Sequence, residues 1–239
     1  MSINIFNLVI YFTAYSFLGW LCETIYCSLP KKQFVNRGFL NGPFCPIYGF
    51  GALIIIICLT RFRNYVFLLF IFSVILTSTL EYLTSYVMEK IFHAKWWDYS
   101  EDKFNINGRV CLKNSLLFGL MSVFFMEFIH RGFSDFVHSL PKNLVETLAI
   151  IFIVYFILDM TASIITAMKI NIMLSEIKIS PNVIKEKFEK YNPSKMLKIR
   201  FQSRRIFYNR IIKAFPNIKY KNHHESLDIL KELLKKKKL

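Results

Sequence analysis

The sequence contains few acidic residues and few of the residues that break helices. Its 239 residues include 16 Asp and Glu against 31 Lys and Arg, with 8 Gly and 7 Pro. Only 20% of the residues are charged and 54% are hydrophobic, whereas average soluble domains have about 25% and about 45–50%. Intrinsic disorder requires low hydrophobicity, so this composition excludes a disordered chain. A net charge of +15 in so apolar a chain indicates that the basic residues are concentrated in one region.

Motifs of several reaction classes are also missing. The chain has no G-x-x-x-x-G-K-[ST] loop, so it cannot hydrolyse ATP by itself, and no G-x-S-x-G nucleophile elbow. Its five cysteines form no C-x-x-C pair, and its five histidines lack metal-ligand spacing. We therefore expect no disulfide framework, no metal and no cofactor. A Cys45 nucleophile with His93 as its base remains conceivable.

The positive charge lies mainly at the C-terminal end. Residues 170–239 hold 18 basic and 6 acidic residues, a net of +12, whereas residues 1–169 have a net of +3. This asymmetry predicts a transmembrane body at 1–169 and a basic cytoplasmic amphipathic tail at 170–239. A DNA-binding tail is the rival interpretation. We expect no nucleic-acid partner, because the tail is attached to membrane spans.

Five apolar stretches are candidate membrane spans. A helix needs about 20 apolar residues to cross a hydrocarbon core of about 30 Å. The expected spans are 5–27, 44–60, 65–87, 112–130 and 144–168. The first has neither a basic n-region nor a cleavage site, so we interpret it as a retained span and not as a signal peptide. The second is short and begins among Pro and Gly, which leaves a re-entrant segment as an alternative.

The predicted fold class is an all-α polytopic membrane protein with about five transmembrane helices plus a basic helical C-terminal tail. An odd number of spans puts the termini on opposite sides. Eight Lys and Arg residues lie in the two loops that would share a side with the tail, against four in the opposite loops. By the positive-inside rule, the N-terminus is expected outside and the C-terminus in the cytoplasm.

Polar residues recur on one face of three expected spans. An ionised acid at the bilayer centre costs about 2.5–3.5 kcal/mol, so such residues face the bundle interior or a wet cavity. The spacing of three and four residues indicates interior stripes. These stripes are Thr77, Glu81, Ser85 and Glu89, then Asp159, Ser163 and Thr166, and the small residues Ser115, Gly119 and Ser122. They fit either helix packing or a functional cavity.

Two loops on the expected tail side, 28–50 and 89–113, are rich in Gly, Pro, aromatic and polar residues. Arg37 and Arg109 in these loops could pair with buried carboxylates or bind an anionic group such as a lipid phosphate. An alternative for Trp96, Trp97 and Tyr99 is the membrane interface. The candidate polar site comprises Glu23, Arg37, Asn41, Tyr48, Glu81, Tyr82, Trp97, Asp98, Asn107 and Arg109.

The same loops carry a resemblance to a known family. The runs are 15–24, 36–39 through 48–49, 80–82 through 96–99, 107–109 and the tail run 213–217. They resemble the bacterial integral-membrane family labelled putative ABC-transporter type IV, or CmpB-like, over roughly residues 10–220. The resemblance implies a permease-like role in a bacterial cell membrane, with ATP hydrolysis supplied by a separate ATPase subunit.

The tail itself predicts three helices. They begin at Ser180-Pro181, at Asn192-Pro193 and near Ser226, since Ser and Asn are favoured N-caps and Pro suits the first turn. In the middle one, which ends before Pro216, three apolar side chains repeat every four residues among five basic ones. The apolar residues are Phe207, Ile211 and Phe215, and the basic ones are Lys198, Arg204, Arg205, Arg210 and Lys213. Such a helix either lies on anionic lipid head groups or docks on a partner.

Three functions fit these patterns. The first is a permease-like or transport-associated component, in which the two loops and the buried acids line a polar pathway. The second is a membrane-embedded enzyme on a lipid-linked or phosphate-bearing substrate, with Asp98 or Glu81 as the acid or base and Arg37 and Arg109 as a phosphate clamp. The third is a non-catalytic scaffold or sensor. A cavity through the bundle would favour the first, a blind pocket the second, and no pocket the third.

The predicted orientation is testable with reporters at the two ends of the chain. A C-terminal fluorescent protein, active only in the cytoplasm, should be bright, while an N-terminal alkaline phosphatase fusion, active only outside, should also be active. Swapping the two reporters provides the control and should silence both. An active phosphatase at the C-terminus would contradict the orientation.

Overall fold

Helices make up nearly all of the regular structure in the computed structural model. It describes residues 4–30, 32–179, 210–216, 218–220 and 227–228. The helices are α1 (Ile5–Ser28), α2 (Pro46–Leu59), the 3₁₀ turn η1 (Thr60–Phe62), α3 (Val66–Phe92), α4 (Leu112–Phe124), the π-helical turn η2 (Phe125–Ile129), α5 (His130–Ser139) and α6 (Lys142–Ile179). This confirms the predicted all-α class.

Four helical segments are long and apolar enough to cross a membrane. They are Ile5–Ser28, Val66–Phe92, Leu112–Ser139 and Lys142–Ile172, whereas the apolar helix Pro46–Phe62 is shorter. The prediction of about five spans therefore corresponds to four full-length helices and one short one. The observed helices also extend past the expected ends at residues 87, 130 and 168, because their polar last turns remain hydrogen-bonded as helix.

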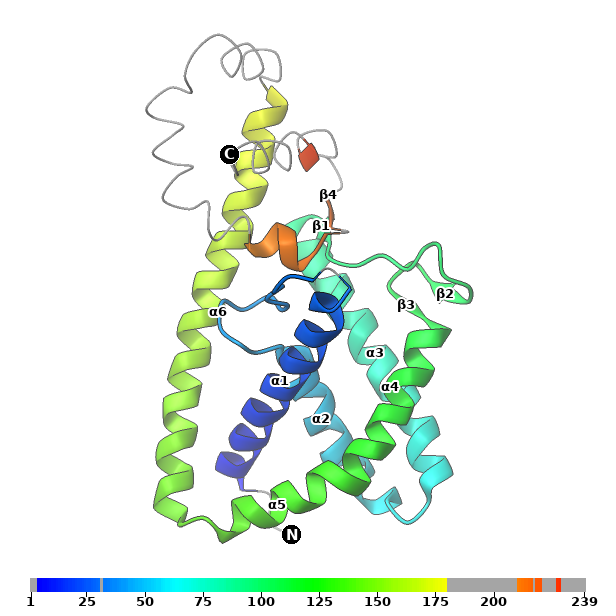
Figure 1. The fold of residues 1–239 in the computed structure, drawn as a ribbon, viewed down its shortest axis with the longest axis vertical. Coiled ribbons are helices and arrows are strands. Elements are labelled where there is room, and N and C mark those ends of the chain that lie inside the picture. Colours follow the sequence, from blue (N-terminus) through cyan, green and yellow to red (C-terminus); the bar gives the residue numbers. More distant parts are fainter. Residues whose placement is uncertain (1–3, 31, 180–209, 217, 221–226, 229–239) are drawn as a thin grey trace.

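Successive apolar helices α1, α2, α3, α4 and α6 run in alternating directions (Figure 1). Residue 4, the turn after α2 and helix α5 lie at one end. The loop between α1 and α2, the segment between α3 and α4, and the described tail residues 210–216 and 218–220 lie at the other end, which we call the tail side (Figure 1). The start of α1 and the described part of the tail therefore lie at opposite ends of the bundle.

Helix α2 begins about halfway along α1. The backbone N–H of Cys45 donates to the Ser16 carbonyl at 2.9 Å, and Ser16 lies in the middle of the 24-residue helix α1. A Cβ at Gly19 would overlap the Tyr48 ring, and one at Gly49 would overlap the Phe12 ring. The apolar helix at Pro46–Phe62 matches the expected short segment at 44–60, and the residues before it enter the bundle as a loop.

The small-residue face predicted for residues 115–122 packs against α3. Ser115, Gly119 and Ser122 are buried, and the Ser78 hydroxyl donates to the Ser115 hydroxyl at 2.7 Å. Large apolar side chains, by contrast, are exposed: Leu120 is 61% and Leu158 is 67% exposed. Buried polar and exposed apolar side chains are the pattern of a protein surrounded by lipid.

Helix α5 lies across the end of the bundle opposite the tail side (Figure 1). A hydrogen bond of 3.1 Å joins Tyr11 to Ser134, and one of 2.8 Å joins Tyr15 to His130. The π-helical turn η2 connects α4 to α5. The sequence did not predict this helix, because residues 131–143 are polar enough to be interpreted as a loop.

Part of the tail belongs to a core on the tail side. Ile211, Ala214 and Tyr220 are at most 1% exposed, and Ile211 and Tyr220 pack in one core with Phe92 and Trp96. Residues 210–214 are helical and the helix ends before Pro216, as predicted. Trp96 is therefore a core residue and not an interfacial one.

Two-residue strands reinforce this core. β4 (Lys219–Tyr220) pairs antiparallel with β1 (Ala94–Lys95), and β2 (Asn105–Ile106) pairs with β3 (Val110–Cys111). Strands of two residues are too short to leave a visible pattern in the sequence. Some predicted features of the tail lie outside the described residues. They are the helix starts at 180, 192 and 226 and the side chains of Phe207, Lys198, Arg204 and Arg205.

Replacing glycine by alanine at two helical positions should have opposite effects on stability. A Cβ at Gly119 would overlap the Val74 side chain and lie 2.9 Å from the Phe70 ring, whereas one at Gly132 meets nothing within 4 Å. Gly119→Ala should lower the free energy of unfolding by about 1–3 kcal/mol through overpacking. Gly132→Ala should be neutral or stabilising by up to about 1 kcal/mol.

Thermal unfolding of both variants in the same detergent checks this pair. A Gly119→Ala protein with a melting temperature equal to or above that of Gly132→Ala would contradict the packing of α4 on α3.

Candidate functional site

The loop between α1 and α2 is held at mid-bundle depth by the Asp159 carboxylate of α6. The backbone N–H groups of Asn41 and Gly42 donate to its two oxygens at 2.9 and 2.8 Å, and the Asn41 side chain donates at 3.0 Å. The hydroxyls of Tyr155 and Ser163 donate to the same carboxylate at 3.2 and 3.3 Å. The acid is thus fully engaged by the loop and by its own helix.

Glycine is required at position 42 for this approach. A Cβ there would overlap the Tyr155 hydroxyl and come within 3.0 Å of Asp159 Oδ2. The backbone of the loop can therefore reach the carboxylate only without a side chain at that residue. Asn41, a predicted site residue, acts here as an anchor of the loop.

Glu23, Arg37 and Tyr48 form one polar group on the tail side. The Tyr48 hydroxyl donates to Glu23 Oε1 at 2.8 Å, and Arg37 Nε donates to Glu23 Oε2 at 3.3 Å. Thr24 adds a hydrogen bond to the backbone N–H of Arg37 at 3.4 Å. The loop 28–50 is in this way fastened to the end of α1.

Glu81 and Tyr99 form a second pair beside the first. The Tyr99 hydroxyl donates to Glu81 Oε1 at 3.2 Å, and the Asn114 side chain lies near Tyr99. Glu81 is only 6% exposed, and its Oε2 has no hydrogen-bond partner among the described residues. Glu23 is near enough to interact electrostatically with Glu81, so the two pairs form one cluster.

Arg109 organises a third group nearer the end of α3. It forms an ion pair with Glu89 at 2.8 Å and donates to the Ser85 hydroxyl at 3.3 Å. Its guanidinium lies 5.6 Å from the ring centre of Tyr82 and 5.4 Å from that of Tyr86. Arg109 therefore neutralises Glu89 and does not contact Glu81.

Two further predicted loop residues, Trp97 and Asn107, support this group. The Trp97 indole donates to the Arg109 carbonyl at 3.0 Å, and the Asn107 amide donates to the Tyr82 hydroxyl at 3.0 Å. Both contacts join the segment between α3 and α4 to the end of α3. They act in positioning Arg109 and do not reach the Glu81 carboxylate.

The tail closes over the loop 28–50 through two arginines. Arg210 donates to three successive carbonyls of the loop, those of Gly38, Phe39 and Leu40, at 3.2, 3.0 and 2.6 Å. In return, Arg37 donates to the Ala214 carbonyl and lies 5.3 Å from the Phe215 ring centre. We call this reciprocal contact the arginine clasp.

A second tail contact joins Lys219 to Asp98 at 2.8 Å. Burial opposes ionisation of Asp98, but the hydrogen bonds from Lys219 and Ser100 outweigh it and lower the pKa of Asp98 to about 2. The carboxyl is therefore ionised throughout the physiological range and cannot serve as a general acid. This argues against Asp98 as the acid of the predicted enzyme, in which Asp98 or Glu81 is the acid or base.

The ten predicted residues thus occupy connected but distinct positions. Glu23, Arg37, Tyr48 and Glu81 belong to one cluster, and Tyr82, Trp97, Asn107 and Arg109 to its neighbour. Asn41 lies at Asp159 and Asp98 at Lys219. The sequence placed Arg210 on a helix expected to face lipid or a partner, and it indicated neither Lys219 nor the link between Tyr99 and Glu81. The four-residue spacing of Ile211 and Phe215 did mark an apolar helix face beside Arg210.

The described residues do not support a cysteine nucleophile or a metal site. Cys45 is buried and its thiol points to the Arg37 carbonyl at 3.8 Å, whereas His93 is exposed, so they do not form a nucleophile and base. No group of three or more histidine, cysteine or acidic side chains that could hold a metal occurs in the part of the chain that the structure describes.

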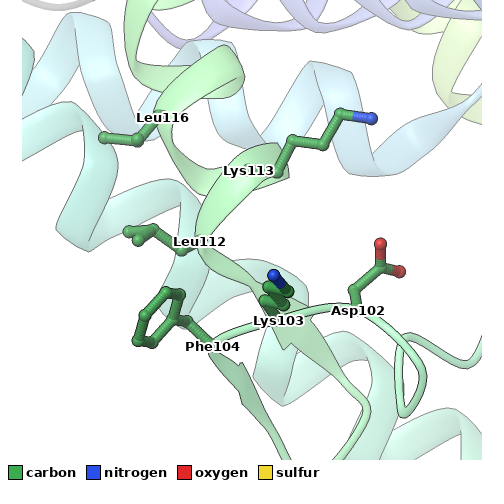
Figure 2. Close-up of a pocket in the computed structure, with 6 residues that line it drawn as sticks. All are labelled: Asp102, Lys103, Phe104, Leu112, Lys113 and Leu116. Carbon is green, nitrogen blue, oxygen red and sulfur yellow. The ribbon is translucent and has the colours of Figure 1, made fainter.

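Two surface cavities lie away from the acidic cluster. One of about 360 Å³ is lined by residues 102–104, 112, 113 and 116 (Figure 2). The other, of about 540 Å³, lies between the outer faces of α3 and α4. Neither is lined by Glu23 or Glu81.

Comparison with known proteins gives one match. A family model described as putative ABC-transporter type IV matches residues 10–164, which include α1 to α5 and the first part of α6. All ten predicted site residues lie inside this match, and the tail residues of the arginine clasp lie outside it. Neither the curated proteins nor the solved structures gave a match.

Breaking the arginine clasp should release the tail from the loop. In Arg210→Lys, amide hydrogens of residues 210–220 should exchange about tenfold faster or more. Hydrogen bonds to a charged group contribute about 1.5–3 kcal/mol, and 1.4 kcal/mol corresponds to tenfold. Hydrogen-exchange mass spectrometry of the purified protein measures this. Arg61→Lys, at an exposed position at the other end of the bundle, is the control, and unchanged exchange in Arg210→Lys would refute the clasp.

Proposed function

Because the chain belongs to the family described as putative ABC-transporter type IV, we propose that it is the membrane-embedded component of a transport system. Its polar site is formed by the loops 28–50 and 89–113 together with Glu23 and Glu81. The chain has no ATPase motif, so the ATPase of this system is a separate subunit.

The observation that carries the proposal is the state of Glu81. The carboxylates of Glu23, Glu89 and Asp159 all have cationic or hydrogen-bonding partners. One oxygen of Glu81 has none among the described residues, although the side chain is almost completely buried. An intramembrane acid is costly to retain and marks a pathway more often than a packing contact. Glu81 is therefore the group that receives a proton or a positively charged solute.

The arrangement around Glu81 supports an access route from the tail side. Tyr99 and Tyr48 link Glu81 and Glu23 to the two loops, and both loops are fastened by the tail. Movement of the loops would expose both acids together, because each loop supplies a hydroxyl to one of them. By the positive-inside rule we assign this side to the cytoplasm, where an ATPase subunit would act.

The enzyme and scaffold alternatives have less support. Arg37 and Arg109, the proposed phosphate clamp, are each paired with a carboxylate. A pure scaffold does not require a buried acid with an unpartnered oxygen. The transport proposal accounts for the unpartnered oxygen of Glu81. It rests on the family and on that residue, since neither surface cavity described above reaches Glu81.

Replacing Glu81 by Gln should uncouple transport without preventing assembly. Affinity purification of the full chain from native membranes should retain a subunit with a G-x-x-x-x-G-K-[ST] motif, for both wild type and Glu81→Gln. ATP hydrolysis by the wild-type complex should depend on the membrane chain. In Glu81→Gln, the stimulation of ATP hydrolysis by the membrane chain should fall at least about tenfold. A loss of this size is typical when one essential acid–base group is removed.

Glu146→Gln is the matched control, since Glu146 is paired with the exposed Lys142 at the opposite end of the bundle. Tyr99→Phe, which removes only the hydroxyl that contacts Glu81, guards against a folding defect of Glu81→Gln and should show an intermediate loss. The proposal fails if no such ATPase accompanies the chain, or if Glu81→Gln and Tyr99→Phe behave like Glu146→Gln.

A further inference from the structure

A surface cavity beside the segment between α3 and α4 combines an apolar wall with three charges. The cavity of about 360 Å³ is lined by Asp102, Lys103, Phe104, Leu112, Lys113 and Leu116. Figure 2 shows Phe104, Leu112 and Leu116 along one side, with Lys103, Lys113 and Asp102 on the other. None of these residues belongs to the acidic cluster around Glu81.

The apolar wall continues into the face of α4 that points away from the protein. Leu112, Leu116, Leu120 and Phe124 repeat every four residues and are 45%, 41%, 61% and 56% exposed. Exposed apolar residues on a membrane-spanning helix contact lipid tails. The cavity therefore lies where lipid tails meet the polar loop layer on the tail side.

The backbone holds the wall in place. Phe104 has a φ of +53°, which is rare for an aromatic residue, and its carbonyl accepts the N–H of Leu112 at 3.1 Å. Its side chain is 79% exposed. The Asn105 amide donates to the Asp102 carbonyl at 2.8 Å, and its oxygen accepts the N–H of Gly108 at 3.0 Å. The backbone at Phe104 is thus held beside Leu112, and the ring lines the cavity from there.

The charges select the head group. Lys103 and Lys113 form no ion pair with any residue that the structure describes, so both ammonium groups are available to a phosphate. Asp102, on the same side of the cavity (Figure 2), would repel a second negative charge and accept hydrogen bonds from an ammonium group. The set complements one phosphate followed by one primary amine.

We propose that this cavity is a binding site for a membrane phospholipid with a primary amine in its head group, of the phosphatidylethanolamine type. The phosphate lies between Lys103 and Lys113, the amine donates to Asp102, and an acyl chain runs along Leu112 and Leu116. This site is separate from the proposed transport site and does not depend on it.

Lipid retention measured by native mass spectrometry tests the site. The purified full chain is delipidated and then given equal amounts of phosphatidylethanolamine, phosphatidylglycerol and phosphatidylcholine. Wild type should retain phosphatidylethanolamine in preference to both others, because phosphatidylglycerol lacks the amine and phosphatidylcholine lacks an N–H donor. Lys103→Gln/Lys113→Gln should weaken retention of phosphatidylethanolamine about tenfold or more.

Asp102→Asn distinguishes head-group selection from a general cationic patch. It should shift the preference from phosphatidylethanolamine to phosphatidylglycerol while total retention stays high. Arg61→Gln/Lys142→Gln removes two positive charges at the opposite end of the bundle and should change neither quantity. All of these side chains are exposed, so the variants should fold.

Two results would overturn the proposal. Equal retention of the three lipids by wild type would show unselective annular lipid. A wild-type preference for phosphatidylglycerol, unchanged in Asp102→Asn, would show a simple cationic surface.

Discussion

Non-helical backbone inside an apolar bundle needs protein partners for its N–H and C=O groups, since lipid provides none. The Asp159 carboxylate meets that need by accepting the N–H groups of Asn41 and Gly42. The Ser16 carbonyl accepts the N–H of Cys45. These contacts let the chain enter the bundle as a loop and leave it as the short helix α2. The half-length second crossing, the position of Tyr48 at Glu23 and the carbonyls presented to Arg210 all follow from them.

The acidic residues of the bundle differ in how completely their oxygens are paired. Asp159 is saturated by amides and hydroxyls, Glu23 by Arg37 and Tyr48, and Glu89 by Arg109. Each of these acids holds one segment in place. Its hydrogen bonds or ion pair offset the free-energy cost of desolvating its charge. Glu81 lies among these fixed segments and accepts a hydrogen bond at only one oxygen. Among the described residues, Glu81 is therefore the buried acid that has neither a cationic partner nor hydrogen bonds at both oxygens.

Much of this architecture was readable from the sequence, and the failures have physical reasons. The stripe through Glu81 and Ser85 faced inward as its spacing indicated, because helical periodicity is a local property. The partners of Arg37 and Arg109 could not be assigned, since several carboxylates were within plausible reach and only folding selects one. The contact of Arg210 with residues 38–40 spans about 170 positions, and periodicity carries no information at that range. The strands β1 and β4 are two residues long, too short for any alternation to be visible.

The arginine clasp has a consequence for the biogenesis of the protein. Three carbonyls of the loop after α1 depend on Arg210, and the guanidinium of Arg37 depends on a carbonyl at residue 214. All of the apolar helices precede that segment in the chain, so they leave the ribosome before it does. Until the ribosome has released residues 210–220, the inserted bundle carries an open loop and an unpaired tail-side core. Completion of the chain is thus also the step that seals its polar centre, and a nascent or truncated product would be a membrane protein with that centre left open.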